Sequence, residues 1–355
     1  MKKVAVTSYC GTGSSAVIDL LSEYSSCTTN GLIRYEHIPF YTPNGIFDLE
    51  DKLINGVDIH RTDEAIKSFK KEMNKLSKNN FGWFGSYEKM YGKAFDTLVD
   101  DFLSELNCFN IRGEWYGQYK GVRFSLIKVI LQLGAKIIQN RKIHKWGRQY
   151  IISGNRKMVA SFPSEDEFYR AAKKFVKGYL DMIGQNLDKN IIYDHLVLPH
   201  NAYRIPNYFD DDFRLIIVDR DVRDMYALSN YVWPKIHSSA PFPKECNEFI
   251  EFWRRMKSCE KFTDDKRIFR LRFEDLVYNY EDTVRKIEEF IGLEAKDHVN
   301  KKKLFDPEKS IKNTQNFTIT DKLKKDSKLI GDKLPEFVYE FPYEIRTSIE
   351  EAFDD

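Results

Sequence analysis

Two glycines and two serines near the start of the chain have the spacing of a loop that binds an anion. Gly11 and Gly13 precede Ser14 and Ser15, between a short apolar run and a segment with helical apolar spacing. In such a strand, loop and helix, backbone N–H groups and the helix start point at one place, which suits a phosphate or a phosphosulfate. We therefore expect Gly11, Thr12, Gly13, Ser14 and Ser15 to hold such a group, with an ordinary strand-to-helix turn as the alternative.

Two nucleotide-binding motifs can be compared with this loop. A Walker A loop places a lysine after its last glycine, whereas Gly13 is followed by serine, which disfavours an ATPase or GTPase. The dinucleotide fingerprint G-x-G-x-x-G/A matches residues 11–16, and Glu36 lies 20 residues past Ala16, near where an acid would meet a ribose hydroxyl. An NAD(P)-dependent oxidoreductase is therefore an alternative, although the strand signal ends about four residues before Gly11, earlier than the fingerprint requires.

Three segments in order resemble a third class. Residues 12–15, T-G-S-S, resemble the 5′-phosphosulfate loop of sulfotransferases. Residues 218–224, V-D-R-D-V-R-D, resemble the R-D-P-R-D segment of that family, and residues 271–277, L-R-F-E-D-L-V, resemble its L-R-Y-E-D-L-V stretch. The chain is therefore similar to sulfotransferases that use 3′-phosphoadenosine-5′-phosphosulfate (PAPS), of the bacterial type related to carbohydrate sulfotransferases.

This resemblance implies a fold and a nucleotide site. The family has a P-loop-NTPase-like parallel sheet flanked by helices, and its members transfer a sulfuryl group from PAPS to a hydroxyl. The resemblance assigns Arg220 to the 3′-phosphate, together with Ser229, which follows Arg220 by nine residues where the family has eight. Lys312 and Asn313 lie in a polar segment that resembles the late loop closing over the nucleotide.

The catalytic residues follow from the same resemblance. In the carbohydrate branch, a glutamate at the end of the second strand is the base, which makes Glu36 the expected general base. His37 is the rival, since an imidazole titrates near neutrality. One departure concerns the first loop, where Gly11 stands in place of the usual lysine or arginine. Lys120, Arg123 and Lys312 are candidates for the missing cation, and a nucleotide- or glycan-binding protein without turnover is the non-enzymatic alternative.

A basic and aromatic segment is the expected acceptor site. Residues 115–164 contain ten lysines and arginines, no acid, and several interleaved aromatic residues. Such a composition suits a groove for an anionic or sugar-like ligand, with a solvated face as the alternative. We expect Lys120 and Arg123 to contact a saccharide there, while a sterol or phenol stays open. Four polar residues that follow another strand could line the same pocket: Asp194, His195, His200 and Asn201.

The elements that position these residues follow an α/β pattern. Apolar runs at 190–194, 213–219 and 267–272 are each followed by a polar switch and a helical pattern, which indicates a parallel sheet covered on both faces. A further strand is expected at 32–35, ending in Glu36, and the clearest helix at 282–291, ended by Gly292. We expect one domain over 1–355, with 45–160 as a helical insertion that forms the acceptor site.

Composition limits the remaining classes. The 355 residues hold 56 Lys and Arg against 54 Asp and Glu, and a net charge of +2 does not indicate a nucleic-acid partner. Five cysteines form no CxxC pair, which favours reduced thiols in a cytoplasmic protein. Neither a signal peptide nor an apolar run long enough to span a membrane is expected. The seven histidines lack metal-ligand spacing, so no metal is expected.

Overall fold

Five parallel strands form the central sheet of the protein, in the order β2-β7-β1-β8-β9. The computed structural model describes all residues except 114–129, 131–132, 135–136, 138–142, 147–148, 153–155, 186, 237–240, 347 and 349–355. The strands of the sheet are β1 Lys3–Ser8, β2 Cys27–Thr28, β7 Asn190–Asp194, β8 Phe213–Asp219 and β9 Ile268–Arg272. The expected α/β class with a parallel sheet is confirmed, as are the runs at 190–194, 213–219 and 267–272.

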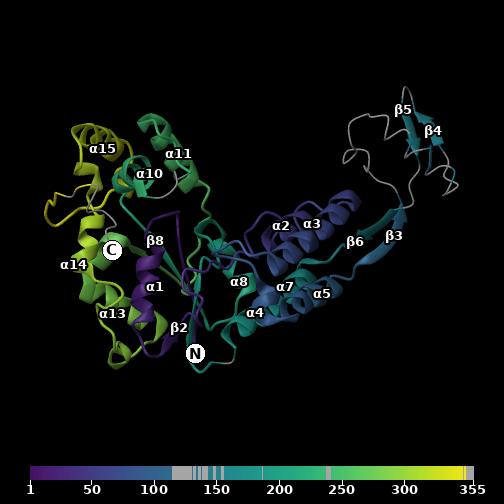
Figure 1. Ribbon diagram of the computed structural model, residues 1–355, viewed down its shortest axis with the longest axis horizontal. Helices are drawn as coiled ribbons and strands as arrows, with labels where there is room; N and C mark the ends of the chain where they lie inside the picture. The colour runs from purple at the N-terminus through teal and green to yellow at the C-terminus, as the bar shows by residue number, and fades with distance from the viewer. Residues whose placement is uncertain are drawn as a thin grey trace.

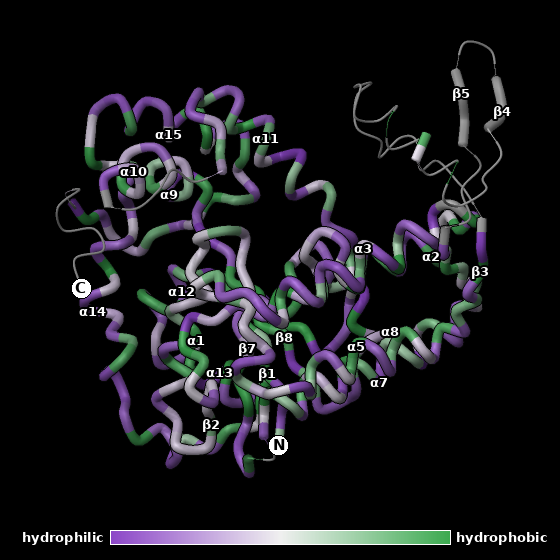
Figure 2. The backbone as a smooth tube through the Cα atoms, turned by 45° about the vertical axis from the view of Figure 1, so that its right-hand side comes forward, coloured by the Kyte–Doolittle hydropathy of each residue, from purple (hydrophilic) through white to green (hydrophobic). Residues whose placement is uncertain are grey.

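Side chains alternate between the two faces of the sheet, and both faces are buried. Ala5 and Ile217 enter a core with one set of helices, whereas Val4 and Ile216 enter a core with another. Parallel strands need cover on both faces, which explains why they are apolar almost throughout. The hydrophobic strands lie inside, and helix α15 on the outside is largely hydrophilic (Figure 2).

The helices form three groups around the sheet (Figure 1). One group packs on the face that includes Ala5: α2 Ile46–Leu53, α3 Ile59–Lys78, α4 Tyr87–Tyr91, α5 Ala94–Glu105, α7 Glu165–Gly184 and α8 Ile205–Tyr208. The opposite face carries α1 Ser14–Ser22, α12 Phe273–Tyr278, α13 Tyr280–Ile291 and α14 Pro307–Ser310. A third group packs on itself through a separate apolar cluster: α9 Val222–Ala227, α10 Trp233–Ile236, α11 Cys246–Ser258 and α15 Asp321–Lys333.

Two helix boundaries show how local sequence sets these elements. α7 begins with a capping box in which the Ser164 hydroxyl accepts from the Glu167 backbone and the Glu167 carboxylate accepts from the Ser164 backbone. α13 ends at Gly292, whose φ of 85° is in the left-handed region that favours glycine. The helix expected at 282–291 is therefore confirmed.

Two sequence-based expectations need correction. The segment expected as the second strand, 32–35, forms turns, and the strand that pairs with β7 on the side away from β1 is the two-residue β2. Glu36 still meets the sheet, because it forms an isolated parallel bridge with Asp194. The segment 45–160 is not helical throughout, because its described part also contains strands. After α5 come two antiparallel pairs, β3 Phe109–Gly113 with β6 Arg156–Ala160, and β4 Ile143–Trp146 with β5 Gln149–Ile152.

The sheet order creates a switch in direction beside its central strand. From β1 the chain passes through α1 to β2 on one side, and from β8 it passes to β9 on the other. Ligands of open α/β sheets bind outside the carboxyl ends of the strands at such a point. The carboxyl ends of β1 and β8 are therefore where a nucleotide site is expected.

Candidate nucleotide and acceptor site

The first loop leaves the start of α1 open for an anion. Gly13 precedes the helix with a φ of 107°, and a Cβ there would lie 2.9 Å from the Phe273 ring, so glycine suits this position on both counts. No side chain caps α1, and its first turn contains no acidic residue. Its first backbone N–H groups and its dipole can therefore meet a negative group.

Thr12, Ser14 and Ser15 have different positions in this loop. Thr12 is fully buried, and its hydroxyl accepts from the Tyr9 backbone at 3.0 Å and donates to the Val218 carbonyl at 2.6 Å. The hydroxyl therefore ties the loop to β8. Ser15 is exposed, whereas Ser14 is buried and hydrogen-bonds to Ser8 at 3.1 Å.

Gly11 lies under an indole ring. Its φ is 83°, and a Cβ at this position would overlap the ring of Trp233, which comes from the first turn of α10. A lysine or arginine at position 11 would therefore meet both backbone strain and a steric clash. The ring of Trp233 thus occupies the space that a lysine or arginine side chain at position 11 would need.

Arg220 follows the carboxyl end of β8 and is almost fully buried. Its guanidinium lies 4.6 Å from the centre of the Phe273 ring and donates to the Asn313 carbonyl, which also accepts from the Asn316 side chain at 2.7 Å. Its Nε has no partner within the described residues. The structure therefore brings two expected nucleotide residues together, and Lys312 precedes Asn313 in the same 3-10 turn, Ile311–Asn313.

Three buried carboxylates surround Arg220. Burial raises the pKa of Asp224 to about 7, although the charge of Arg220 opposes this shift. Burial, with a smaller effect of the Asp221 charge, raises the pKa of Glu274 to about 8. Asp221 is also fully buried, and burial lowers the pKa of Arg220. A protonated Glu274 leaves more of the guanidinium charge available to an anion.

Ser229 lies in a π-helical turn, Leu228–Val232, between α9 and α10. A π turn takes in an additional residue relative to an α-helix. Ser229 therefore lies at the start of a local widening of the helix. The Ser229 hydroxyl is buried and donates to the Tyr226 carbonyl at 3.1 Å.

A second cluster of titratable groups lies at the ends of β7 and β1. Oδ1 of Asp194 lies within hydrogen-bond distance, 2.6 Å, of Nδ1 of His195. On the other side of the ring, Nε2 of His195 lies 3.3 Å from the Ser8 hydroxyl. The Ser8 contact with Ser14 extends this series of hydrogen bonds to the start of α1. Burial alone would lower the pKa of His195, but the hydrogen bond and charge of Asp194 raise it overall, and Glu36 adds to this effect.

Glu36 lies beside this cluster and is half-buried. Burial raises the pKa of its carboxyl group, His195 opposes this shift, and the Asp194 charge adds to it. The Tyr41 hydroxyl lies 3.5 Å from its Oε2. The sequence placed His195 only among the acceptor-pocket candidates, because Ser8, which its ring contacts, lies 187 residues away along the chain.

His37 points into the core. Its Nδ1 lies 2.8 Å from the Tyr179 hydroxyl, and the rings of Tyr35, Tyr179 and Tyr193 stand edge-on to it. It is 1% exposed, and burial lowers its pKa to about 3. His37 is therefore packed in the core, whereas Glu36, the other expected base, faces Asp194 and His195.

The remaining acceptor candidates are separated in the structure. His200 lies edge-on to the Tyr9 ring, and its Nε2 is 2.8 Å from the Met256 carbonyl. It is therefore near the first loop, while Asp194 belongs to the histidine cluster. Lys120 and Arg123 lie outside the described residues.

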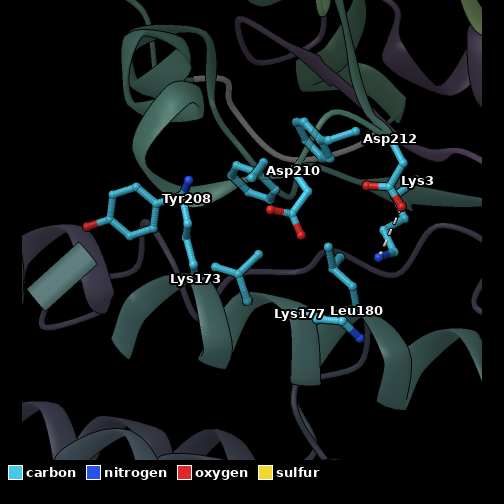
Figure 3. Close-up of a pocket in the computed structure, with 10 residues that line it drawn as sticks. Lys3, Lys173, Lys177, Leu180, Tyr208, Asp210 and Asp212 are labelled. Carbon is cyan, nitrogen blue, oxygen red and sulfur yellow. Dashed lines mark ion pairs between the residues drawn. The ribbon is translucent and has the colours of Figure 1, made fainter. Parts of the chain in front are cut away.

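A small hollow lies at the opposite end of the sheet (Figure 3). Its lining includes Lys3, Lys173, Lys177, Asp210 and Asp212, from the amino ends of β1 and β8 and from α7. Figure 3 shows Lys3 turned toward Asp212, with which it forms an ion pair at 3.3 Å. This hollow is at the wrong end of the strands for the loop at Gly11–Ser15.

The sequence model of the sulfotransferase domain matches residues 169–355, a little more than half of the chain. The chain therefore belongs to the sulfotransferase domain family, and it is an enzyme of the class that transfers a sulfuryl group from PAPS. The matched part includes Arg220, Glu274 and Asn313. The dinucleotide alternative also disagrees with the fold, because β7 lies between β1 and β2, whereas the dinucleotide arrangement places those two strands side by side.

Two solved structures are similar to the chain at low identity. Sulfotransferase STF9 from Mycobacterium avium is 11% identical, with a TM-score of 0.36, over 98% of this chain and 78% of the other. A sulfotransferase domain from the curacin biosynthetic pathway is 9% identical, with a TM-score of 0.35, over 98% and 94%. No curated protein matches the chain. The family assignment rests on the domain match.

Two further features concern the described residues alone. In these parts of the chain, no helix is both long enough and apolar enough to cross a bilayer. The same parts contain no group of three or more His, Cys, Asp or Glu side chains arranged to hold a metal ion. All five cysteines are unpaired.

Proposed function

We propose that this enzyme transfers the sulfuryl group of PAPS to a hydroxyl of a saccharide in the cytoplasm, with the nucleotide at the carboxyl ends of β1 and β8. The observation that carries this proposal is that Gly13, at the uncapped start of α1, and the buried guanidinium of Arg220 both lie against the ring of Phe273. An N–H cluster and an arginine with an unpartnered Nε fit a donor with two separate anionic ends. The unpaired cysteines agree with a reducing compartment.

The proposed nucleotide contacts divide between the two ends of the donor. Gly13, Ser14 and Ser15 hold the 5′ end through backbone N–H groups and the exposed Ser15 hydroxyl. Thr12 holds the loop in shape through its bonds to Tyr9 and β8, and Gly11 makes the turn. Together these groups stabilise charge on the leaving phosphate.

The 3′ end of the donor has its own proposed contacts. Arg220 binds the 3′-phosphate, and Ser229 supports that site from the π turn. Lys312 and Asn313 cover the nucleotide from the late loop, with the Asn313 carbonyl already in contact with Arg220. When the donor binds, Arg220 exchanges its hydrogen bond to the Asn313 carbonyl for one to the 3′-phosphate.

We assign the removal of the acceptor proton to Glu36 and the Asp194–His195 pair. In sulfuryl transfer the acceptor oxygen attacks in line as charge builds on the leaving oxygen, so the attacking hydroxyl must lose a proton. His195 is oriented by Asp194 through Nδ1 and turns Nε2 toward Ser8 at the loop. Glu36 has a raised pKa and lies beside this imidazole, which suits a carboxylate that accepts or relays the proton.

The saccharide part of the proposal rests on composition. The segment 115–164 combines ten basic residues with aromatic rings, and no acid lies within it. Aromatic faces stack on sugars and basic groups meet acidic substituents, so we assign acceptor binding to the part of the single domain at 45–160. Lys120 and Arg123 are the proposed contacts there, and Asp194 at the end of β7 and His200 in the following 3-10 turn are proposed to face the acceptor.

Calorimetric titration tests the nucleotide part of the proposal. We expect tight binding of adenosine 3′,5′-bisphosphate, the desulfated product, and weaker binding of ATP and NADH, because neither control carries the 3′-phosphate that Arg220 requires. Binding of NADH without the bisphosphate would contradict the proposal. Transfer of radiolabelled sulfate from PAPS to a panel of saccharides, sterols and phenols then tests the acceptor class.

The variant Glu36→Gln separates turnover from nucleotide binding. We expect the bisphosphate affinity to stay unchanged, because Glu36 is placed at the acceptor side, while kcat falls by about 10²- to 10⁴-fold. A variant that keeps full turnover would remove Glu36 from the reaction. Loss of nucleotide affinity would instead agree with a ribose-binding role.

A further inference from the structure

Lys257, near the end of α11, lies against the first loop. Its Nζ is 3.5 Å from the centre of the Tyr9 ring and 2.6 Å from Oδ2 of Asp219, the last residue of β8. The lysine side chain is only 10% exposed. Tyr9 begins the loop, and its backbone N–H is held by Thr12, so the ammonium group lies where β1, β8 and the loop meet.

The loop itself lacks a cation at this place. Position 11 is glycine, and the ring of Trp233 fills the space that a side chain there would need. Sulfuryl transfer builds negative charge on the oxygen that leaves with the 5′-phosphate. Backbone N–H groups at α1 meet part of that charge, and a nearby ammonium would meet more of it.

Other basic groups near the loop have different positions. Arg270 pairs with Glu260 and reaches the Tyr9 hydroxyl, which is the end of that side chain far from the loop backbone. Lys261 lies over the ring of Tyr203, 4.3 Å from its centre. Arg220 lies inside the carboxylate cluster and is assigned to the 3′-phosphate. Lys257 alone of these four sits against the ring of Tyr9 and the end of β8.

We propose that Lys257 is the cation that replaces the missing loop residue, and that its ammonium group exchanges Asp219 for the 5′-phosphate when the donor binds. This inference rests on the PAPS site proposed above. Asp219 holds the lysine in place beforehand, and it also accepts from the Arg220 backbone at 3.0 Å. The Asp219 carboxylate therefore positions both Lys257, for the 5′-phosphate, and Arg220, for the 3′-phosphate.

The test compares two ligands that differ only in the 5′-phosphate. Adenosine 3′,5′-bisphosphate and adenosine 3′-monophosphate are titrated into the intact protein, and the ratio of their affinities measures what the 5′-phosphate contributes. We expect Lys257→Met to reduce this ratio by about 10- to 150-fold, the value of one hydrogen bond to a charged group. Affinity for the 3′-monophosphate stays the same.

Three further variants separate the proposed contact from a structural ion pair. Lys257→Arg keeps the charge and is expected to retain most of the ratio. Asp219→Asn breaks the same ion pair but leaves the lysine, so the ratio is expected to hold or rise. Lys261→Met, on the neighbouring lysine that faces Tyr203, is the matched control and leaves both affinities unchanged. Thermal unfolding of each variant confirms that it folds.

The outcomes are distinct. If the unaltered protein does not bind the bisphosphate, the proposed function fails with it. If the unaltered protein binds and Lys257→Met lowers both affinities equally, or neither, the lysine has no role at the 5′-phosphate. If Asp219→Asn lowers the ratio by about 10-fold or more, the ion pair is structural and the inference is overturned, whether or not Lys257→Met folds.

Discussion

The two ends of the central sheet differ in how their charged groups are matched. At the amino end, Lys3 pairs with Asp212 at 3.3 Å and Asp181 at 3.7 Å beside an open hollow. At the carboxyl end, Arg220, Asp224 and Glu274 are buried, and each has an atom without a partner in the described part of the chain. A buried donor without a partner is costly, so an anion that accepts a hydrogen bond from Nε of Arg220 is favoured. The comparison teaches that a buried cation with a free donor atom, and not empty volume, marks the proposed nucleotide site.

Replacing His195 is expected to have the largest effect. His195→Asn suits the backbone, because the φ of 48° is one that asparagine tolerates, but it removes the imidazole next to Ser8. We expect kcat to fall by about 10²- to 10⁴-fold, with the affinity for adenosine 3′,5′-bisphosphate nearly unchanged. Steady-state kinetics and calorimetry measure the two quantities, and a variant with normal kcat would exclude His195 from the proton transfer.

Replacing Arg220 is expected to affect binding most. Arg220→Met keeps the contact with the Phe273 ring but removes the charge, and we expect bisphosphate binding to weaken by about 1.5–3 kcal/mol. Arg254→Met, on the exposed side of α11, is the control and should leave the affinity unchanged. Equal affinities for the Arg220 variant and the unaltered protein would place the 3′-phosphate elsewhere.

The buried carboxyl groups predict how stability varies with pH. The pKa of Glu274 is raised to about 8, so between about pH 4.5 and pH 8 the folded protein holds a proton that the unfolded chain releases. Its contribution is full below the unfolded pKa and is lost as pH rises through 8, at no more than about 1.4 kcal/mol per pH unit. Urea unfolding from pH 5 to pH 9 measures this slope.

The variant Glu274→Gln serves as the control for that slope. A glutamine can still accept the hydrogen bond from the Asp221 backbone, which is 2.9 Å long, but it does not titrate. We expect the stability of this variant to depend less on pH over the same range. Identical slopes for the variant and the unaltered protein would show that Glu274 is ionised in the folded state.

The smallest effect is expected at the amino end of the sheet. Lys3→Met breaks two ion pairs whose acids are about two-fifths exposed, so the free energy of unfolding should change by no more than about 1 kcal/mol. Bisphosphate affinity and kcat should stay the same. A change in the bisphosphate affinity of Lys3→Met would indicate that the hollow beside Lys3 binds nucleotide.

Much of the sheet could be predicted from the sequence, because β7, β8 and β9 are short, largely apolar segments that end in polar residues. The glycines at positions 11 and 13 likewise indicated the first loop. The short strand β2 could not be predicted, since two residues form no pattern, and the apolar run at 32–35 contains Arg34 in a left-handed conformation that breaks a strand.

Side-chain partners across the fold could not be predicted either. His37 and Glu36 are neighbours in sequence, but one enters an aromatic core and the other faces the cluster of His195. Lys257 is 248 residues from Tyr9, and no spacing in the sequence relates the two. Only the packing of α11 against the ends of the strands brings them together.

A crystal structure of the complex with adenosine 3′,5′-bisphosphate tests the central claim most directly. We expect the 5′-phosphate on the backbone N–H groups at the start of α1 and the 3′-phosphate beside Arg220, at the carboxyl ends of β1 and β8. The hollow beside Lys3 should contain no nucleotide. A bisphosphate bound at the amino end of the sheet, or away from Arg220, would contradict the account.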